Sequence, residues 1–417
     1  MNVLLISTTE SAGGGAIAAR RLLIALEEAG INAKMMVRDR QTNHPSVIAL
    51  KQSKFDVWRF VWERFVIWCN NLFCIKNLFK VSIANTGYDI TQTKEFAEAD
   101  IVHLHWTNQG MLSLDCLQKI IRSGKKIVWT MHDMWQCTGI CHHAYSCDKF
   151  KTECMECPFL FLPHKKDLSN KVFLKKQKLF ERSGISIVTV SRWLERQVKE
   201  SALSRYCPTQ VIPNTLSLSD FQIKDKNKCR EQLGIAQNKK VIIFGAVRID
   251  DPIKGFGMVI QAIQYLIDSK IYTAEQLHLI TFGKFKKEKP YIPVTHTDMG
   301  WVGDNAILSC LYSAADVSIS ASLYETFGQT LIEAQACGCI PVSFGNSGQT
   351  DIITHKLNGF MADYLSVQSL AEGIKWAFIK GDSINKNNLR DEVLNKYSGE
   401  VIAQKYIALY QGLINDK

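Results

Sequence analysis

Residues 315–345 read ADVSISASLYETFGQTLIEAQACGCIPVSFG and hold two short apolar runs with a longer segment between them. The runs ADVSISAS and IPVSFG have the length and composition of buried strands. The residues from Phe327 to Cys337 lack proline and suit a helix. A strand, a helix and a second strand in this order predict a β-α-β unit of a parallel sheet.

The same alternation extends through the chain in two series, separated by a polar, lysine-rich linker at 213–240. The second series continues the quoted stretch upstream, and the first series opens the chain. The predicted strands are VLLIS (3–7), AKMMVR (33–38), DIVHLHW (100–106), KKIVWTMHD (125–133), SIVTVS (186–191), KKVIIFGAV (239–247), HLITFG (278–283) and WVGDN (301–305). Two such series predict an α/β protein of two doubly wound Rossmann-like domains that face a central cleft.

We place the domains at 1–214 and 215–395, followed by an amphipathic C-terminal helix at 396–417. The 417 residues, 46% hydrophobic and 22% charged, are typical of folded domains and not of disorder. The N-terminus has no signal-peptide pattern, and no stretch of about 18 apolar residues is free of charge. We therefore expect a cytoplasmic protein, with its 13 cysteines as thiols or metal ligands.

Two carboxylates flank the start of the predicted helix in the quoted stretch. Glu325 precedes this start and Glu333 lies inside the helix, with Gly328 between them. The free N–H groups of a helix start can hold phosphate or sugar oxygens, and carboxylates accept hydrogen bonds from vicinal hydroxyls. The alternative is a helix-terminal charge at Glu325 and a solvated surface residue at Glu333.

Two cations follow the first strand of the second domain. Arg248 ends the strand, and Lys254-Gly255 follows six residues later. Their charges suit a diphosphate leaving group, and the alternative is a pair of solvated surface cations. The net charge of +10 also favours an anionic partner, although no nucleic-acid-binding module is recognisable. The order of Arg248, Lys254, Asp316 and the two glutamates favours a nucleotide-sugar site.

The second half resembles the retaining glycosyltransferases of family 4, which have the GT-B fold, including bacterial exopolysaccharide and colanic-acid types. The resemblance rests on Gly303, Leu311-Tyr312, Ala315-Asp316, Glu325, Phe327-Gly328, Glu333-Ala334, Gly338, Pro341-Val342 and Asn358-Gly359, and more weakly on Gly14-Gly15 and Thr130-Met131-His132. Gln329, Thr330, Gln335 and Cys339 depart from the commonest pattern, which affects packing or sugar choice.

The resemblance implies a role for each matching residue. Arg248 and Lys254 would bind the donor diphosphate, Glu325 the transferred sugar and Glu333 the ribose. The remaining donor contacts would come from Gly14, Gly15, His132 near the reacting centre, Trp301 and Val302 beside the base, and the backbone of Phe327, Gly328, Gln329 and Thr330. The catalytic set would be Glu325, His132, Arg248 and Lys254, acting without a catalytic cofactor.

The resemblance also implies transfer of a hexose-type sugar to a saccharide, with retention of configuration, in bacterial surface polysaccharide synthesis. It further implies that the C-terminal helix at 396–417 crosses back onto the first domain. The chain has no Asp-x-Asp motif for a catalytic metal ion. The rival interpretation is an NAD-dependent oxidoreductase or nucleotide-sugar epimerase, since Gly13-x-Gly15-x-x-Ala18 precedes a helix and Asp39 follows. It leaves Arg248, Lys254 and the glutamates unexplained.

A cysteine-rich insert at 137–157 follows His132-Asp133. Cys154-x-x-Cys157 has zinc-knuckle spacing, and Cys141 with Cys147 would complete four ligands for a structural zinc ion. The alternative is a set of free thiols in an irregular loop.

Residues 51–80 combine aromatic and basic residues. Trp58, Val61, Trp62 and Phe65 recur at helical spacing, and Lys165 and Lys166 belong to a second basic stretch. Such a helix either lies in an anionic membrane interface or packs its aromatic face on the domain core. The membrane interpretation predicts a lipid-linked oligosaccharide acceptor at the inner face of the cytoplasmic membrane. His103 and His105 could line an acceptor site, but we expect satisfied strand-end histidines.

Overall fold

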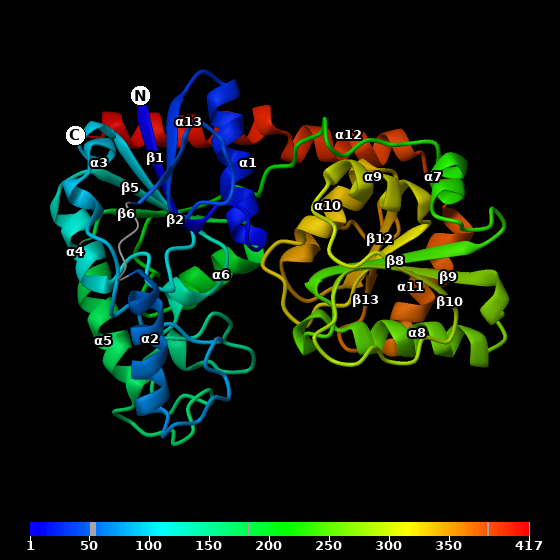
Figure 1. Cartoon of the computed structure of the whole chain (residues 1–417), viewed down its shortest axis with the longest axis horizontal. Helices are drawn as coiled ribbons and strands as arrows, with labels where there is room; N and C mark the ends of the chain where they lie inside the picture. Colours follow the sequence, from blue (N-terminus) through cyan, green and yellow to red (C-terminus); the bar gives the residue numbers. More distant parts are fainter. Residues whose placement is uncertain (51–55, 182, 382, 417) are drawn as a thin grey trace. The chain divides into compact units, whose positions relative to one another are not determined.

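The computed structural model describes residues 1–50, 56–181, 183–381 and 383–416 (Figure 1). Backbone contacts divide the chain into unit 1, which holds residues 1–214 and the C-terminal segment from Ile402, and unit 2, which holds Thr215–Val401. The first five residues of the aromatic stretch 51–80 lie outside the described residues.

Unit 1 is built on a parallel sheet that has seven strands in the described residues, in the order β3-β2-β1-β4-β5-β6-β7. The strands are β1 (Asn2–Thr9), β2 (Asn32–Asp39), β3 (Val47–Ala49), β4 (Ile101–Leu104), β5 (Lys126–Met131), β6 (Ile185–Thr189) and β7 (Thr209–Val211). The central strands are buried along almost their whole length because helices cover both faces of the sheet.

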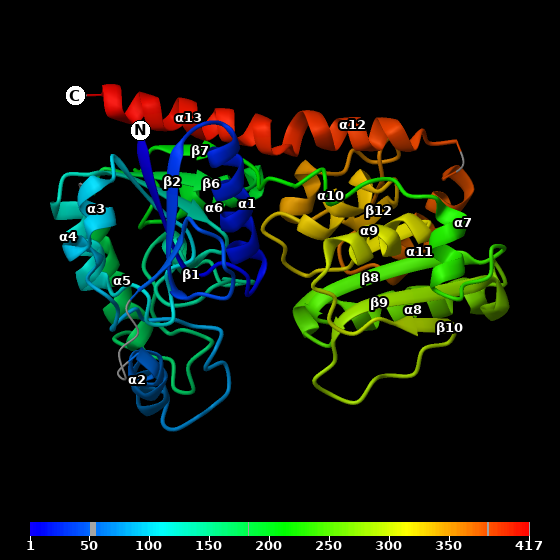
Figure 2. The ribbon, with the colours of Figure 1, turned by 45° about the horizontal axis from the view of Figure 1, so that its top comes forward.

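The helices of unit 1 are α1 (Gly14–Glu28), α2 (Asp56–Asn70), α3 (Lys94–Glu98), α4 (Leu114–Arg122), α5 (Leu168–Phe180), α6 (Arg192–Glu200) and the greater part of α13 (Gly399–Asn415). Short 3-10 turns occur at Ile90–Gln92, Trp135–Cys137 and Lys149–Lys151. Leu22, Leu23 and Leu26 of α1 share one hydrophobic cluster with Tyr406 and Tyr410 of α13. The C-terminal helix is therefore part of the core of unit 1 (Figure 2).

Unit 2 repeats this design with a parallel sheet of six strands in the described residues, ordered β10-β9-β8-β11-β12-β13. The strands are β8 (Lys240–Arg248), β9 (Leu277–Lys284), β10 (Thr295–Asp298), β11 (Val317–Ser320), β12 (Ile340–Phe344) and β13 (Phe360–Ala362). The helices are α7 (Lys226–Gln232), α8 (Phe256–Asp268), α9 (Asn305–Ala314), α10 (Gln329–Ala336), α11 (Val367–Lys380) and α12 (Lys386–Tyr397), with 3-10 turns at Pro252–Lys254, Ala274–Gln276 and Gly348–Asp351.

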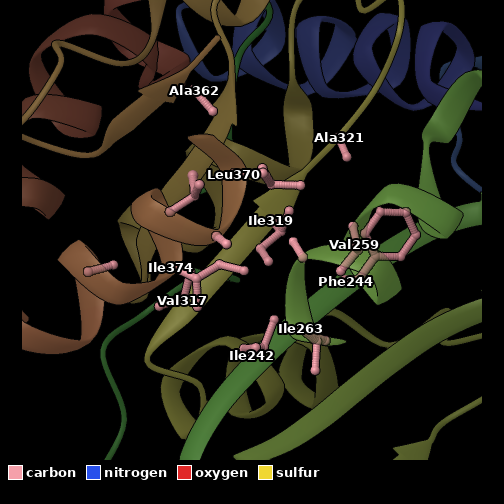
Figure 3. Packing of buried hydrophobic residues seen from close by; sticks show 14 of the residues in the cluster. Ile242, Phe244, Val259, Ile263, Val317, Ile319, Ala321, Ala362, Leu370 and Ile374 are labelled. Carbon is pink, nitrogen blue, oxygen red and sulfur yellow. The ribbon is translucent and has the colours of Figure 1, made fainter. Parts of the chain in front are cut away.

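Figure 3 shows how strands and helices of unit 2 meet in its core. Ile242 and Phe244 of β8 lie beside Val259 and Ile263 of α8 in one buried cluster, which also includes Ile319 of β11. Branched side chains of this kind pack closely between a sheet and the helices on its face. The cluster fixes the carboxyl ends of β8 and β11 next to the start of α8.

One predicted strand is wrong. The sequence predicts a strand at WVGDN, but residues 301–304 form a loop, and the strand at this edge is β10, upstream. Gly300 lies between them with φ of 60°, which ends the extended backbone. Trp301 is consequently on a loop, half exposed, and not in a sheet.

Within the described residues, no helix has both the length and the apolar character needed to cross a membrane.

Candidate active site

Both sheets have a switch point, where neighbouring strands lead to connections on opposite sides. It lies between β1 and β4 in unit 1 and between β8 and β11 in unit 2. Ligands of doubly wound sheets bind beyond the carboxyl ends of the strands at this point. Most of the residues predicted from the sequence lie at or beside these points, after β1 and β5 in unit 1 and after β8 and β11 in unit 2, whereas Trp301 and Val302 follow the edge strand β10.

In unit 2 the structure brings two predicted residues together. Lys254 Nζ donates to Glu325 Oε2 at 2.8 Å, and Ser322 Oγ donates to the same oxygen at 3.3 Å. Both side chains keep part of their surface exposed. A cation and a carboxylate thus sit side by side at the switch point, each within reach of a ligand.

Close backbone contacts hold these two residues in place. Gly255 follows Lys254 in a left-handed conformation with φ of 70°, and a Cβ there would lie 2.0 Å from the Ala321 carbonyl oxygen. Only glycine allows α8 to start so close to the end of β11. The loop that carries Glu325 is fixed through its backbone, since Glu325 N–H donates to Ser347 Oγ at 3.1 Å and Gly348 N–H to Glu325 O at 2.7 Å.

Arg248 has partners that the sequence did not indicate. Its Nε lies 3.3 Å from Asp250 Oδ1 and its Nη2 lies 3.6 Å from Asp251 Oδ2. The Arg248 side chain is 37% exposed although its Nε is buried, so a phosphate ligand would compete with these carboxylates for the guanidinium.

The helix after Glu325 begins at Gln329, two residues later than predicted, because Gly328 adopts φ of 112° as its N-cap. The free N–H groups of α10 therefore start at Gln329 and Thr330. Both amide atoms of the Gln329 side chain, Nε2 and Oε1, are buried without a hydrogen-bond partner among the described residues. An unpaired buried amide is costly, and a ligand with hydroxyl groups would satisfy it.

Glu333 is buried, with 7% of its surface exposed, so the alternative of a solvated surface residue is wrong. The Tyr312 hydroxyl donates to Glu333 Oε2 at 3.4 Å, and burial raises the pKa of Tyr312 well above its usual value. Trp301 and Val302 occupy the loop between β10 and α9, partly exposed.

In unit 1 the structure places Gly15 against His132. A Cβ on Gly15 would lie 2.9 Å from Cγ of the His132 ring, so no side chain fits between α1 and the imidazole. Gly14 is open instead, because a methyl group in place of its hydrogen would meet nothing within 4 Å. The two glycines therefore differ: Gly15 makes room for His132, whereas the space beside the Gly14 Cα is open.

Histidines gather behind this contact. His105 Nδ1 and His132 Nε2 share a hydrogen bond of 3.0 Å, and the rings stack at 5.3 Å. Burial lowers the pKa of His132 to about 4, that of His103 to about 3 and that of His105 well below the usual value. All three imidazoles are therefore neutral near pH 7.

His103 is a satisfied strand-end histidine, as expected. Its Nε2 bonds Thr130 Oγ1 at 2.7 Å, and its Nδ1 bonds the Tyr410 hydroxyl at 2.7 Å. His105 differs, because its Nε2 is buried without a partner among the described residues while its Nδ1 holds His132. His105 is not among the predicted site residues, although its place directly after β4 could have included it.

Asp133, next to His132, anchors the cysteine-rich insert. Its carboxylate accepts from His142 Nδ1 at 2.7 Å, Trp106 Nε1 at 2.9 Å and Trp135 N–H at 2.8 Å. Burial acts to raise the pKa of Asp133, but the attraction and hydrogen bond of His142 outweigh it and lower that pKa to about 2. Two consecutive residues after β5 thus have different surroundings: His132 contacts Gly15 and His105, and Asp133 holds the insert.

The four predicted zinc ligands, Cys141, Cys147, Cys154 and Cys157, line one small pocket in unit 1. Gly139 N–H donates to Cys154 Sγ at 3.2 Å. Burial raises the pKa of Cys154 to about 11 and that of Cys157 to about 12. Among the described residues, however, no three His, Cys, Asp or Glu side chains are grouped so that they could hold a metal ion.

Two Rossmann-like sheets, each with polar residues gathered at its switch point, define the class of protein. The Anabaena protein Alr3699/HepE, solved in complex with UDP-glucose, matches 99% of this chain and 100% of its own length, with a TM-score of 0.65 and 16% identity. Structures of this kind are GT-B glycosyltransferases, and the chain has the GT-B fold.

A family match lies in unit 2. Residues 225–392 match Glycosyl transferases group 1, so unit 2 holds a domain of this type. The chain is 25% identical over 370 residues to glycosyltransferase MJ1607 of Methanocaldococcus jannaschii. The aligned region covers 81% of this chain and 90% of that protein. It is 24% identical over 325 residues to Escherichia coli WcaC, named for colanic acid biosynthesis, with 75% of each chain covered.

Proposed function

We propose that this protein transfers a hexose-type sugar from a nucleotide-sugar donor to a saccharide acceptor, with retention of configuration, as in family 4. The observation that carries the proposal is the Lys254–Glu325 pair at the switch point of unit 2. A cation for phosphate and a carboxylate for hydroxyls, 2.8 Å apart, match the two chemically different ends of the bond between a diphosphate and a sugar.

The donor would occupy the edge of unit 2. Lys254 and Arg248 would bind the diphosphate, with Arg248 exchanging Asp250 and Asp251 for phosphate oxygens. Glu325 and the N–H groups at the start of α10 would hold the sugar hydroxyls, and Glu333 the ribose. Trp301 and Val302 would lie beside the base.

Catalysis would rest on stabilising the leaving group. As the sugar–phosphate bond breaks, negative charge moves onto the diphosphate, where Lys254 and Arg248 stabilise it without a metal ion. The acceptor hydroxyl attacks the anomeric carbon from the face that the diphosphate leaves, and its proton passes to a phosphate oxygen. A neutral His132 in unit 1 would donate to or accept from a sugar hydroxyl, and Gly14 would offer its backbone N–H to the diphosphate.

For the acceptor we propose a lipid-linked saccharide of a bacterial surface polysaccharide, used in the cytoplasm at the inner face of the membrane. The support is the similarity to WcaC, named for colanic acid biosynthesis. We propose UDP-glucose as the first donor to test, since the Anabaena protein is in complex with it.

The test is release of nucleoside diphosphate from a panel of UDP-, GDP-, ADP- and TDP-sugars, with Glu325→Ala, Glu325→Gln and an exposed control, Glu372→Ala. Release from one donor that falls at least about 100-fold in Glu325→Ala and is unchanged in Glu372→Ala supports the proposal. Tight NADH binding with no donor turnover would overturn it in favour of an oxidoreductase.

We also propose a structural zinc ion for the cysteine pocket, because thiolates are preferred zinc ligands and the four cysteines share one space. Binding would have to draw the sulfurs together. About one zinc per chain in the purified protein, lost in Cys154→Ser/Cys157→Ser, supports this. If the purified protein contains no zinc and chelators do not change its stability, the proposal is wrong and the cysteines are free thiols.

A further inference from the structure

Helix α2 turns polar side chains toward unit 1 and aromatic side chains outward, whereas a helix that packs on a core turns its apolar side inward. The side turned to unit 1 carries Glu63 and Arg64, both buried and 3.0 Å apart as an ion pair. Glu63 Oε1 accepts from the N–H groups of Ile83 and Ala84 at 2.8 Å each, and Arg64 Nη1 donates to Val81 O at 2.9 Å. These polar contacts attach the helix to the domain, together with the buried side chain of Ile67.

The aromatic side of α2 is turned outward. Trp58 is 64% exposed, Trp62 50% and Phe65 45%. These positions recur every three or four residues, so they form one continuous face. The interpretation that this face packs on the core of unit 1 is therefore wrong. Figures 1 and 2 both show α2 at the periphery of unit 1, away from its sheet.

Neighbouring loops extend this face. Phe73 is 63% exposed and Phe79 65%, in the loop after α2, and Phe161 is 60% exposed in the loop that follows the cysteine pocket. The two loops are joined, since Phe161 N–H donates to Asn71 Oδ1 at 2.6 Å and Asn77 Nδ2 to Phe159 O at 3.3 Å. We call the exposed side chains of Trp58, Trp62, Phe65, Phe73, Phe79 and Phe161 the aromatic surface.

The exposed charges in the two segments that carry the aromatic surface have one sign. Lys76, Lys80, Lys165 and Lys166 are exposed, and none of them forms an ion pair within the described part of the chain. Residues 57–80 and 158–166 contain one carboxylate, Glu63, which is buried. The exposed charge in these segments is therefore entirely positive.

We propose that the aromatic surface binds the headgroup region of an anionic lipid bilayer. Tryptophan and phenylalanine rings enter the interface between headgroups and acyl chains, and lysines contact lipid phosphates, so one partner satisfies both features. A second copy of the chain would bring the same lysines together across a two-fold axis and would be repelled. The inference adds to the proposed function a surface by which the enzyme reaches a lipid-linked acceptor.

The first test is co-sedimentation of the full chain with vesicles of phosphatidylcholine alone or with about one-third phosphatidylglycerol. We expect binding to the anionic vesicles, and a partition coefficient at least about tenfold lower for Trp58→Ser/Trp62→Ser/Phe65→Ser. The matched control, Tyr206→Ser/Tyr291→Ser/Ile379→Ser, removes three large side chains elsewhere that are on average more exposed, and it should bind like wild type. Circular dichroism and thermal melts establish that each variant is folded.

Two further variants separate the lipid contacts. Lys165→Glu/Lys166→Glu should weaken binding to anionic vesicles about three- to tenfold and leave any binding to neutral vesicles unchanged. Brominated lipids should quench the tryptophan fluorescence of the wild type. Trp58→Phe/Trp62→Phe should still bind and should lose most of that quenching.

Failure of wild-type binding, equal binding by the triple serine variant, or equal affinity for neutral vesicles would overturn the proposal. So would a dimer in light scattering that the triple variant makes monomeric, without vesicle binding. Sedimentation needs neither donor nor turnover, so a protein that binds vesicles but releases diphosphate from no donor would lose the proposed function and keep this inference.

Discussion

At the switch point of unit 2 the predicted site residues are charged and partly exposed, whereas beside that of unit 1 the side chains are buried, neutral imidazoles next to a glycine. Lys254, Glu325 and Arg248 keep their charges near water and exchange partners readily. His132 and His105 have no nearby anion strong enough to offset burial, and their pKa values fall well below 6.5. The same strand order therefore supports two different electrostatic environments.

The difference suggests a division of labour. A diphosphate brings negative charge and needs mobile cations, which only unit 2 presents among the described predicted site residues. An uncharged sugar or acceptor needs shape and neutral hydrogen-bonding groups, which the glycine and imidazoles of unit 1 present. Substitutions in the two units should thus fail in different ways.

The largest effect is expected at Lys254. Lys254→Ala removes a cation placed where leaving-group charge develops, so kcat/KM for the donor should fall about 10²- to 10³-fold. Lys375→Ala, at an exposed position on α11, should match wild type. A loss smaller than about threefold in Lys254→Ala would break the assignment of diphosphate binding to unit 2.

In unit 1 the limiting factor is space. Gly15→Ala places a methyl group 2.9 Å from the His132 ring, so the ring or α1 must move. We expect a loss of kcat/KM of about 10- to 100-fold with the fold retained. Gly412→Ala in α13 meets nothing within 4 Å and serves as the control. Full activity in Gly15→Ala would show that the position of His132 is unimportant.

The neutral imidazoles predict loss of stability in acid. His132 has a pKa of about 4 in the folded protein and about 6.5 in the unfolded chain, so on acidification the unfolded chain binds the proton first. The free energy of unfolding is therefore at its full value above about pH 6.5 and declines as the pH falls toward about 4. At pH 5.5 this costs about 1.4 kcal/mol for His132. Urea unfolding between pH 8 and 5 should show this slope, shallower in His103→Gln and unchanged in His355→Asn, an exposed histidine. A flat profile would contradict buried neutral histidines.

The smallest effect is expected at Gln329, whose buried amide has no partner in the described residues. If a sugar hydroxyl satisfies it, Gln329→Ala should change the ratio of kcat/KM between two epimeric donor sugars about fivefold. Thr330→Ser, beside it, should alter the ratio less. An unchanged ratio in Gln329→Ala would mean that Glu325 and the backbone select the donor sugar without the Gln329 side chain.

Much of the fold could be predicted from the sequence because parallel strands buried on both faces are continuous apolar runs. Lys254 and Glu325 were both predicted as site residues, and the structure places their charged atoms 2.8 Å apart. The strand at WVGDN was wrong because one glycine conformation outweighed the apolar pattern. The later start of α10 has the same origin in Gly328.

Other features depend on residues distant in sequence and were not predictable. Arg248 pairs with aspartates whose orientation comes from the fold, and Asp133 binds His142 across the insert. The pattern of α2 indicated one aromatic face and one polar face. Which face is covered was decided by loop residues near 83, whose N–H groups bind Glu63.

The packing of α13 has a consequence for how this gene can be divided. Tyr406 bonds Thr130 and Tyr410 bonds His103, while Ile402 and Ala403 complete the same hydrophobic cluster. A fragment that encodes only residues 1–214 would lack these side chains and leave part of its core open to water. Domain exchange with a relative must therefore transfer two separate segments, and recombination with a single crossover would separate the sheet of unit 1 from the helix that completes its core.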